Sequence, residues 1–137
     1  MERTLIGLGV LTAAFMVVFW GAVFLGLSPV EELVPGHRAW VFSFPLVDGW
    51  VGFWAARMAL LLGRTRTEAA RRAALVGGSG LVFLGVHELT YGFYTGLALH
   101  PSGGELVEFV VQAYCLVVGA LFLRWGLEGP AAEAVTS

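Results

Sequence analysis

Three carboxylates and one amide lie inside apolar stretches of this sequence, where such groups are costly. Asp48 lies near the start of one apolar stretch, Glu88 lies within a second, and Glu108 and Gln112 lie within a third. A carboxylate removed from water must be protonated, paired with a cation or hydrogen-bonded. Ionisable residues within a hydrophobic span mark functional sites by default. These groups have the chemistry to pair with an amine, to hydrogen-bond a hydroxyl or to transfer a proton.

Helical periodicity places each of these polar side chains on a face that is otherwise made of small residues. At about 100° per residue, three stripes arise: Asp48, Gly52, Ala55 and Ala59; Gly85, Glu88, Gly92 and Gly96; and Glu108, Gln112, Cys115 and Gly119. Small residues let membrane helices approach closely. We therefore expect the polar members of the three stripes to point into one bundle. The alternative is that they are packing contacts, each contributing around 0.6–2 kcal/mol.

The composition predicts one membrane domain, since the chain has 137 residues, of which 58 % are apolar and 13 % charged. Several apolar stretches approach or exceed the roughly 20 residues that cross a bilayer. Only helices or a closed barrel satisfy the backbone in lipid, and these long, glycine-punctuated stretches favour helices. We therefore expect an all-α, integral membrane four-helix bundle over residues 1–127 and a disordered tail over 128–137. The expected helices cover about 4–27, 45–63, 73–97 and 105–127.

The arginines predict the orientation of the bundle. Half of the positive residues, Arg64, Arg66, Arg71 and Arg72, fall in the expected loop 64–72. The positive-inside rule places this loop and both termini in the cytoplasm. We expect a multi-pass protein of the cell (inner or plasma) membrane. The loop over 28–43 then lies outside, and its Ser-Pro-Val-Glu start predicts one or two helical turns on the surface.

With this orientation, the acidic residues lie in the outer half of the membrane. At 1.5 Å per residue, Asp48 and Glu108 lie roughly 5 Å below the outer ends of their helices. Gln112 lies about 10 Å and Glu88 about 13 Å down by the same rise. Three carboxylates that converge there are either partly protonated or neutralised by a cation.

Three further residues are candidates for the same site. His87 neighbours Glu88, and Tyr91 follows His87 by one helical turn. Arg57 leaves the face opposite Asp48, because nine residues turn a helix by about 180°. We expect Arg57 to stack on an aromatic ring or extend to the cytoplasmic interface, in preference to a buried pair with Glu88.

The sequence lacks the motifs of several common functions. It contains no GxSxG, no HExxH and no Walker loop. The single cysteine, Cys115, excludes a redox pair of cysteines. No metal site or cofactor is expected, because His87 and Glu88 diverge by about 100° on a helix. Nucleic acid is not an expected partner, because no basic patch carries interleaved aromatic residues.

Three features of the sequence resemble those of a known group of proteins. They are the arginine turn and the two stretches Phe44-Pro45-Leu46-Val47-Asp48-Gly49-Trp50 and Leu89-Thr90-Tyr91-Gly92-Phe93-Tyr94. With these motifs the chain resembles a group of small, uncharacterised bacterial four-helix membrane proteins over nearly its whole length. A looser likeness links it to the sterol-isomerase and sigma-2-receptor class. That likeness implies acidic and histidine side chains in a pocket within the membrane, similar in kind to Asp48, His87, Glu88 and Glu108.

Three functions remain open from the sequence. The leading hypothesis is a binding protein whose pocket takes a lipid-like or cationic amphiphilic ligand. The second is an enzyme that acts on a membrane-soluble substrate, with Glu88 or His87 transferring a proton. The third is an accessory membrane subunit whose acids only hold helices together. The expected partners are membrane lipids, a hydrophobic small molecule and further copies of the same chain, and an ion path would need such copies.

Overall fold

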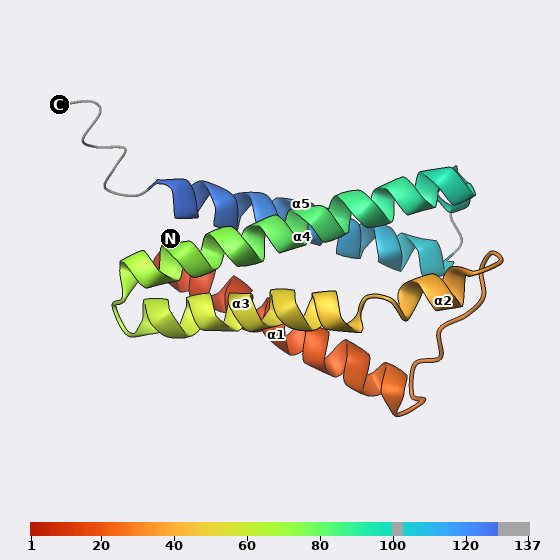
Figure 1. Cartoon of the computed structure of the whole chain (residues 1–137), viewed down its shortest axis with the longest axis horizontal. Helices are drawn as coiled ribbons and strands as arrows, with labels where there is room; N and C mark the ends of the chain where they lie inside the picture. Colours follow the sequence, from red (N-terminus) through yellow and green to blue (C-terminus); the bar gives the residue numbers. More distant parts are fainter. Residues whose placement is uncertain (100–102, 129–137) are drawn as a thin grey trace.

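Four long apolar helices run along the length of the molecule (Figure 1). The computed structural model describes residues 1–99 and 103–128. In this part of the chain each long helix contains a segment long and apolar enough to cross a membrane, so the chain is an all-α, multi-pass membrane protein. The helices are α1 (Glu2–Phe24), α3 (Pro45–Gly63), α4 (Thr67–Thr95) and α5 (Gly103–Leu127), with the short α2 (His37–Val41) and η1 (Leu97–Leu99) in the connections.

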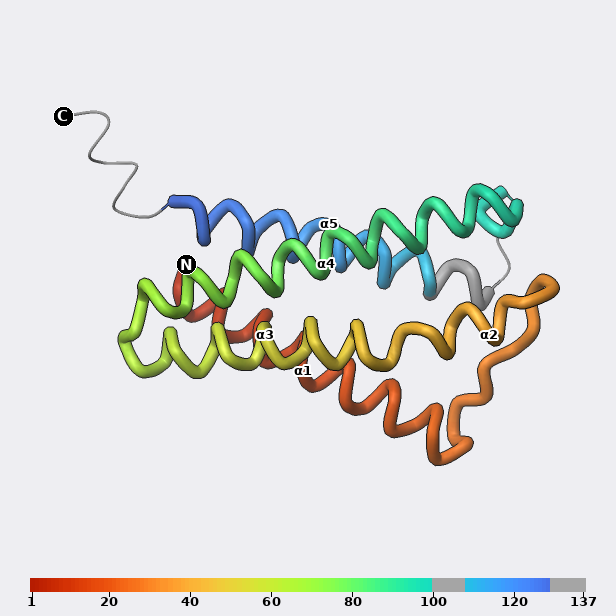
Figure 2. Tube along the Cα trace, viewed as in Figure 1, coloured from red at the N-terminus to blue at the C-terminus, as the bar shows by residue number. Residues whose placement is uncertain are grey.

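The two ends of the bundle differ in charge. One end holds the start of α1, the turn between α3 and α4 and the end of α5 (Figure 2). We call it the arginine end, because it carries Arg3, Arg64, Arg66, Arg71, Arg72 and Arg124. At the opposite end, which we call the acidic end, α2 lies near the end of α4 and the start of α5. Its carboxylates include Glu31, Glu32, Asp48, Glu88 and Glu108.

Contacts between the helices run in a series, with α3 packed against both α1 and α4, and α4 packed against α5. A hydrogen bond also links α1 to α5, since Thr12 and Tyr114 hold their hydroxyl oxygens 2.7 Å apart. Thr12 donates to the carbonyl of Leu8, so Tyr114 is the donor in the pair. Towards the acidic end, α1 diverges from α3 (Figure 2).

Glycines allow the closest approaches between helices, as the small-residue stripes predict. A methyl group added at Gly78 would lie 2.9 Å from the Gly119 carbonyl oxygen, and one added at Gly9 would lie 2.7 Å from the Ala55 carbonyl oxygen. Cys115 and Gly119 are buried, as are Gly52, Ala55 and Ala59 on the α3 stripe. The small residues of the α3 and α5 stripes therefore lie where the helices meet, and on the α4 stripe Gly85 does so as well, against Leu116.

The structure corrects several expected helix bounds. α4 begins at Thr67, so Arg71 and Arg72 lie on a helix and the expected loop 64–72 is only a tight turn. Glu68 in the first turn pairs with Arg72 four residues on, at 3.2 Å, and such pairs extend a helix beyond its apolar part. α1 ends at Phe24 and α5 begins at Gly103. Of the expected tail over 128–137, residues 129–137 lie outside the described residues.

The helical turns expected from Ser28 onward are wrong, because residues 28–34 are not helical and the short helix begins at His37. Its cap is Gly36, with a φ of 87° that favours glycine. Glu32 accepts hydrogen bonds from the backbone N–H groups of Gly36 and Arg38, at 2.6 and 2.8 Å. The carboxylate thus satisfies free N–H groups at the start of α2 instead of lying within a helix.

Replacing Gly78 by alanine tests the close contact between α4 and α5. The added methyl group meets backbone atoms and Phe122 at about 3 Å, so Gly78→Ala should lower the free energy of unfolding in detergent by about 1–3 kcal/mol. Gly63→Ala is the control, because its methyl group would meet nothing within 4 Å. Equal stability of the two variants would contradict the packing described here.

Candidate functional site

Asp48 is held at the acidic end by a hydrogen bond from another helix. Trp20 of α1 donates its indole Nε1–H to Oδ2 of Asp48 at 2.8 Å. Trp20 is buried and Asp48 is half-buried. A charged acceptor makes a stronger hydrogen bond than a neutral one, so this bond fixes both the carboxylate and the position of α1. In the described part of the chain the other oxygen of Asp48, Oδ1, has no hydrogen-bond partner.

Glu88 of α4 is the second acid of the candidate site. Its half-buried carboxyl group is close enough to Asp48 and to Glu108 for their charges to repel its own. Within residues 1–99 and 103–128 it makes no hydrogen bond and no ion pair. The three acids lie on three different helices, α3, α4 and α5, and the charges of Asp48 and Glu108 both act on Glu88. Glu88 is the member that the protein itself leaves without a partner.

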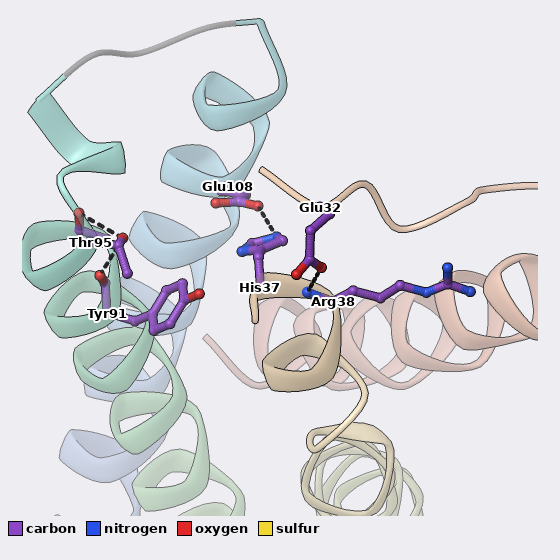
Figure 3. A network of polar contacts seen from close by, with 7 residues as sticks. Glu32, His37, Arg38, Tyr91, Thr95 and Glu108 are labelled. Atoms are coloured by element: carbon purple, nitrogen blue, oxygen red, sulfur yellow. Dashed lines mark hydrogen bonds and ion pairs between the residues drawn. The ribbon is translucent and has the colours of Figure 1, made fainter. Parts of the chain in front are cut away.

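Gln112 and His37 add buried polar atoms near Glu108, and Figure 3 shows His37 beside it. Gln112 is 6 % exposed, and its Oε1 has no hydrogen-bond partner among the described residues. It lines a cleft of about 10 Å³ together with Glu108 and Gly92. His37 is 2 % exposed and directs Nε2 towards Glu108 Oε1 at 3.7 Å, while its Nδ1 lacks a partner in the same part of the chain.

α2 covers the acidic end of the bundle and brings His37 to the site. The ring of Trp40 stacks on Tyr91 of α4 with a centroid distance of 3.8 Å and an angle of 9°. His37 also contacts the Tyr91 ring. Tyr91, one of the predicted site residues, therefore supports α2 through its aromatic face. Two aromatic contacts and the approach of His37 to Glu108 anchor α2 over the space between α4 and α5 (Figure 3).

Two predicted site residues are exposed and contact aromatic rings. His87 is exposed and stacks on Phe83 at 5.6 Å with an angle of 6°. Arg57 is also exposed, and its guanidinium lies over the Trp54 ring, 5.3 Å from the centroid. This stacked arrangement is the one expected for Arg57, which forms no ion pair with Glu88 among the described residues.

Sequence reasoning missed Trp20 and His37. Trp20 lies in an apolar helix, where a tryptophan is an ordinary packing residue, and only the crossing of α1 over α3 brings its indole to Asp48. His37 lies in a connection, where no helical period indicates which residues face inward. The buried His37 would have been recognisable only from the fold of α2 against α4 and α5.

The arrangement is rich in acceptors. The Asp48 carboxylate accepts a hydrogen bond from Trp20, and the Gln112 amide oxygen is unsatisfied among the described residues. No group of three metal-ligating side chains occurs in the same part of the chain. Such a site suits a ligand that donates several hydrogen bonds and carries positive charge. The chain matches no known family model, no curated protein and no solved structure.

Replacing Trp20 by phenylalanine tests the bond to Asp48. The variant keeps an aromatic ring but leaves a half-buried carboxylate without its donor, which should cost about 1–3 kcal/mol of unfolding free energy. Trp50→Phe, at a position that is 55 % exposed, is the matched control. The bond does not matter if chemical unfolding in detergent gives the same loss for both variants.

The hydrogen bonds that Glu32 accepts from the backbone N–H groups of Gly36 and Arg38 should depend on pH. Hydrogen bonds from the Arg38 and Gly36 backbone lower the pKa of Glu32 below its ordinary value. Its stabilising effect on the loop is therefore complete above the ordinary pKa and is lost as the pH falls through the lowered one. The amide resonances of Gly36 and Arg38 should move in an NMR titration, with a midpoint below the ordinary pKa of a glutamate. A midpoint at or above that ordinary value, or resonances that do not move, would contradict these hydrogen bonds.

Proposed function

We propose that the chain binds a membrane-soluble amphiphilic cation whose amine lies among Asp48, Glu88 and Glu108. The observation that carries the proposal is the half-buried Glu88 carboxyl, which has no hydrogen bond or ion pair within the described residues and lies beside two further acids. A buried negative group needs a cation or a proton. An ammonium group supplies the charge and three hydrogen-bond donors at once.

The neighbouring groups favour an amine over a hydroxyl ligand. Asp48 Oδ1 and Gln112 Oε1 are acceptors without donors in the described part of the chain. A hydroxyl group donates one hydrogen bond, whereas a primary ammonium donates three. Arg38, the arginine of the acidic end, is exposed and lies over the ring of Phe42 at 5.8 Å. The positive charge is therefore expected from the ligand.

The same observation weighs against the accessory-subunit alternative. An acid that holds helices together does so through a hydrogen bond across the interface, as Asp48 does with Trp20. Glu88 makes no such bond in the part of the chain described. The isomerase-like alternative uses Glu88 or His87 for proton transfer, and the His87 ring is occupied by contacts with Phe83, Trp40 and Phe44.

We place the arginine end in the cytoplasm of a bacterial cell, following the positive-inside rule. The acidic end then lies in the outer half of the inner membrane, where a cation from outside or from the outer leaflet reaches it. Membrane lipids are the surrounding partners. We also propose that the chain is related to the small four-helix family and, more loosely, to the sterol-isomerase class. The acidic side chains within a helical membrane bundle support this relation.

Hexadecylamine is a direct probe of the proposal. Removing the charge of Glu88 should weaken its binding in nanodiscs by about 10- to 100-fold, because a charged hydrogen bond contributes roughly 1.5–3 kcal/mol. Glu88→Gln is the test variant, and Glu68→Gln is the control, since Glu68 lies on the same helix at the arginine end and is exposed.

Hexadecanol measures the contribution of the amine itself, and it should bind both variants and the parent chain equally weakly. The proposal is wrong if Glu88→Gln binds hexadecylamine as the parent chain does. It is also wrong if the amine and the alcohol bind the parent chain with equal affinity.

A further inference from the structure

An open groove separates α1 from α3 towards the acidic end. Its volume is about 430 Å³, within the range of roughly 300–1,000 Å³ that is typical of small-molecule sites. It forms where α1 diverges from α3 (Figure 2). The groove, which we call the α1–α3 groove, is lined by Ala13, Met16, Val17, Trp20, Phe24, Pro45, Gly49, Gly52, Phe53 and Ala56.

The groove adjoins the acidic site through Trp20. One side of the Trp20 side chain lines the groove, while its Nε1–H donates to Asp48 Oδ2 at 2.8 Å. Asp48 is also the neighbour of Gly49 in the α3 helix, and Gly49 lines the groove. The apolar α1–α3 groove thus ends beside Asp48, whose Oδ1 has no hydrogen-bond partner in the described part of the chain.

The groove is the more accessible route to the acids. α2 covers the acidic end, with Trp40 stacked on Tyr91 and His37 buried beside Glu108. The cleft beside Glu108 and Gln112 measures only about 10 Å³, which is about the space of one water molecule. A ligand with an apolar body therefore has room between α1 and α3, where exposed apolar side chains such as Val17 and Phe53 face the hydrocarbon.

From this juxtaposition we infer that the α1–α3 groove holds the alkyl chain of the amine ligand, which enters sideways from the membrane. The inference rests on the proposed function, because the charge of Asp48 selects an amine over other chain-bearing molecules. The occupant is a single-chain alkylamine with its ammonium group at Asp48 and Glu88. Its chain lies against Met16 and Phe53 along the groove.

Gly49 offers a way to fill the groove without disturbing the helices. A methyl group added at Gly49 would meet nothing within 4 Å, whereas one added at Gly52 would lie 3.3 Å from Met16. Gly49→Phe should therefore occupy the groove at little cost to packing. Gly63→Phe is the matched control on the same helix, since Gly63 also has open space and lies at the arginine end.

Photolabelling with a hexadecylamine that carries a diazirine in mid-chain tests the inference in nanodiscs. In the parent chain the label should attach to groove residues such as Met16, Val17 and Phe53, identified by peptide mass spectrometry. Gly49→Phe should remove this labelling and weaken hexadecylamine binding at least about tenfold, since each buried methylene contributes roughly 0.8 kcal/mol. Gly63→Phe should label and bind as the parent chain does.

Butylamine separates a failure of the groove from a failure of the acidic site. Its short chain should make its weak binding sensitive to Glu88→Gln but not to Gly49→Phe. Labelling of α4 and α5 instead of the groove would overturn the inference even if Glu88→Gln abolishes binding. Equal labelling of the groove by a diazirine phosphatidylcholine would assign the groove to bulk lipid and also overturn it. The parent-chain labelling pattern decides the question without any variant.

Discussion

The close approach of α4 to α5 is the contact on which the acidic site depends. It is closest where Gly78 faces Gly119, and at Gly85 an added methyl group would lie 2.8 Å from the Leu116 side chain. Glu88 follows Gly78 by about 15 Å along α4 at the usual helical rise. A larger residue at these glycines would push the helices apart and separate Glu88 from Glu108. Packing and site are therefore built from the same stripes.

The three acids differ in the partner that stabilises each carboxyl group within the bundle. Asp48 receives a donor from Trp20, and Glu108 has the buried His37 at 3.7 Å, whereas Glu88 is left to its ligand in our account. The charge distribution supports this division, because six of the eight arginines lie at the opposite end of the bundle. Two of these six, Arg72 and Arg124, pair there with Glu68 and Glu128. A cation attracted to the acidic end meets little competition.

Much of the bundle could be predicted from the sequence, because a helix in lipid imposes one period on its residues. The stripes of Asp48, Glu88 and Glu108 with their small neighbours identified the faces that meet. The connection over 25–44 has no such period, so the positions of α2 and of the buried His37 could not be predicted from the sequence. The Trp20 bond depends on how α1 crosses α3, and a crossing angle is set by packing that single-helix patterns do not contain.

The mutual proximity of the acids is tested most directly by a double-mutant cycle on unfolding free energy in detergent, at a pH where free carboxyl groups are ionised. If Asp48 and Glu88 repel each other across the bundle, the combined effect of Asp48→Asn and Glu88→Gln should differ from the sum of the single effects by about 0.5–3 kcal/mol. Additivity within about 0.3–0.5 kcal/mol, the behaviour of distant and independent sites, would show that the two carboxyl groups do not share a site.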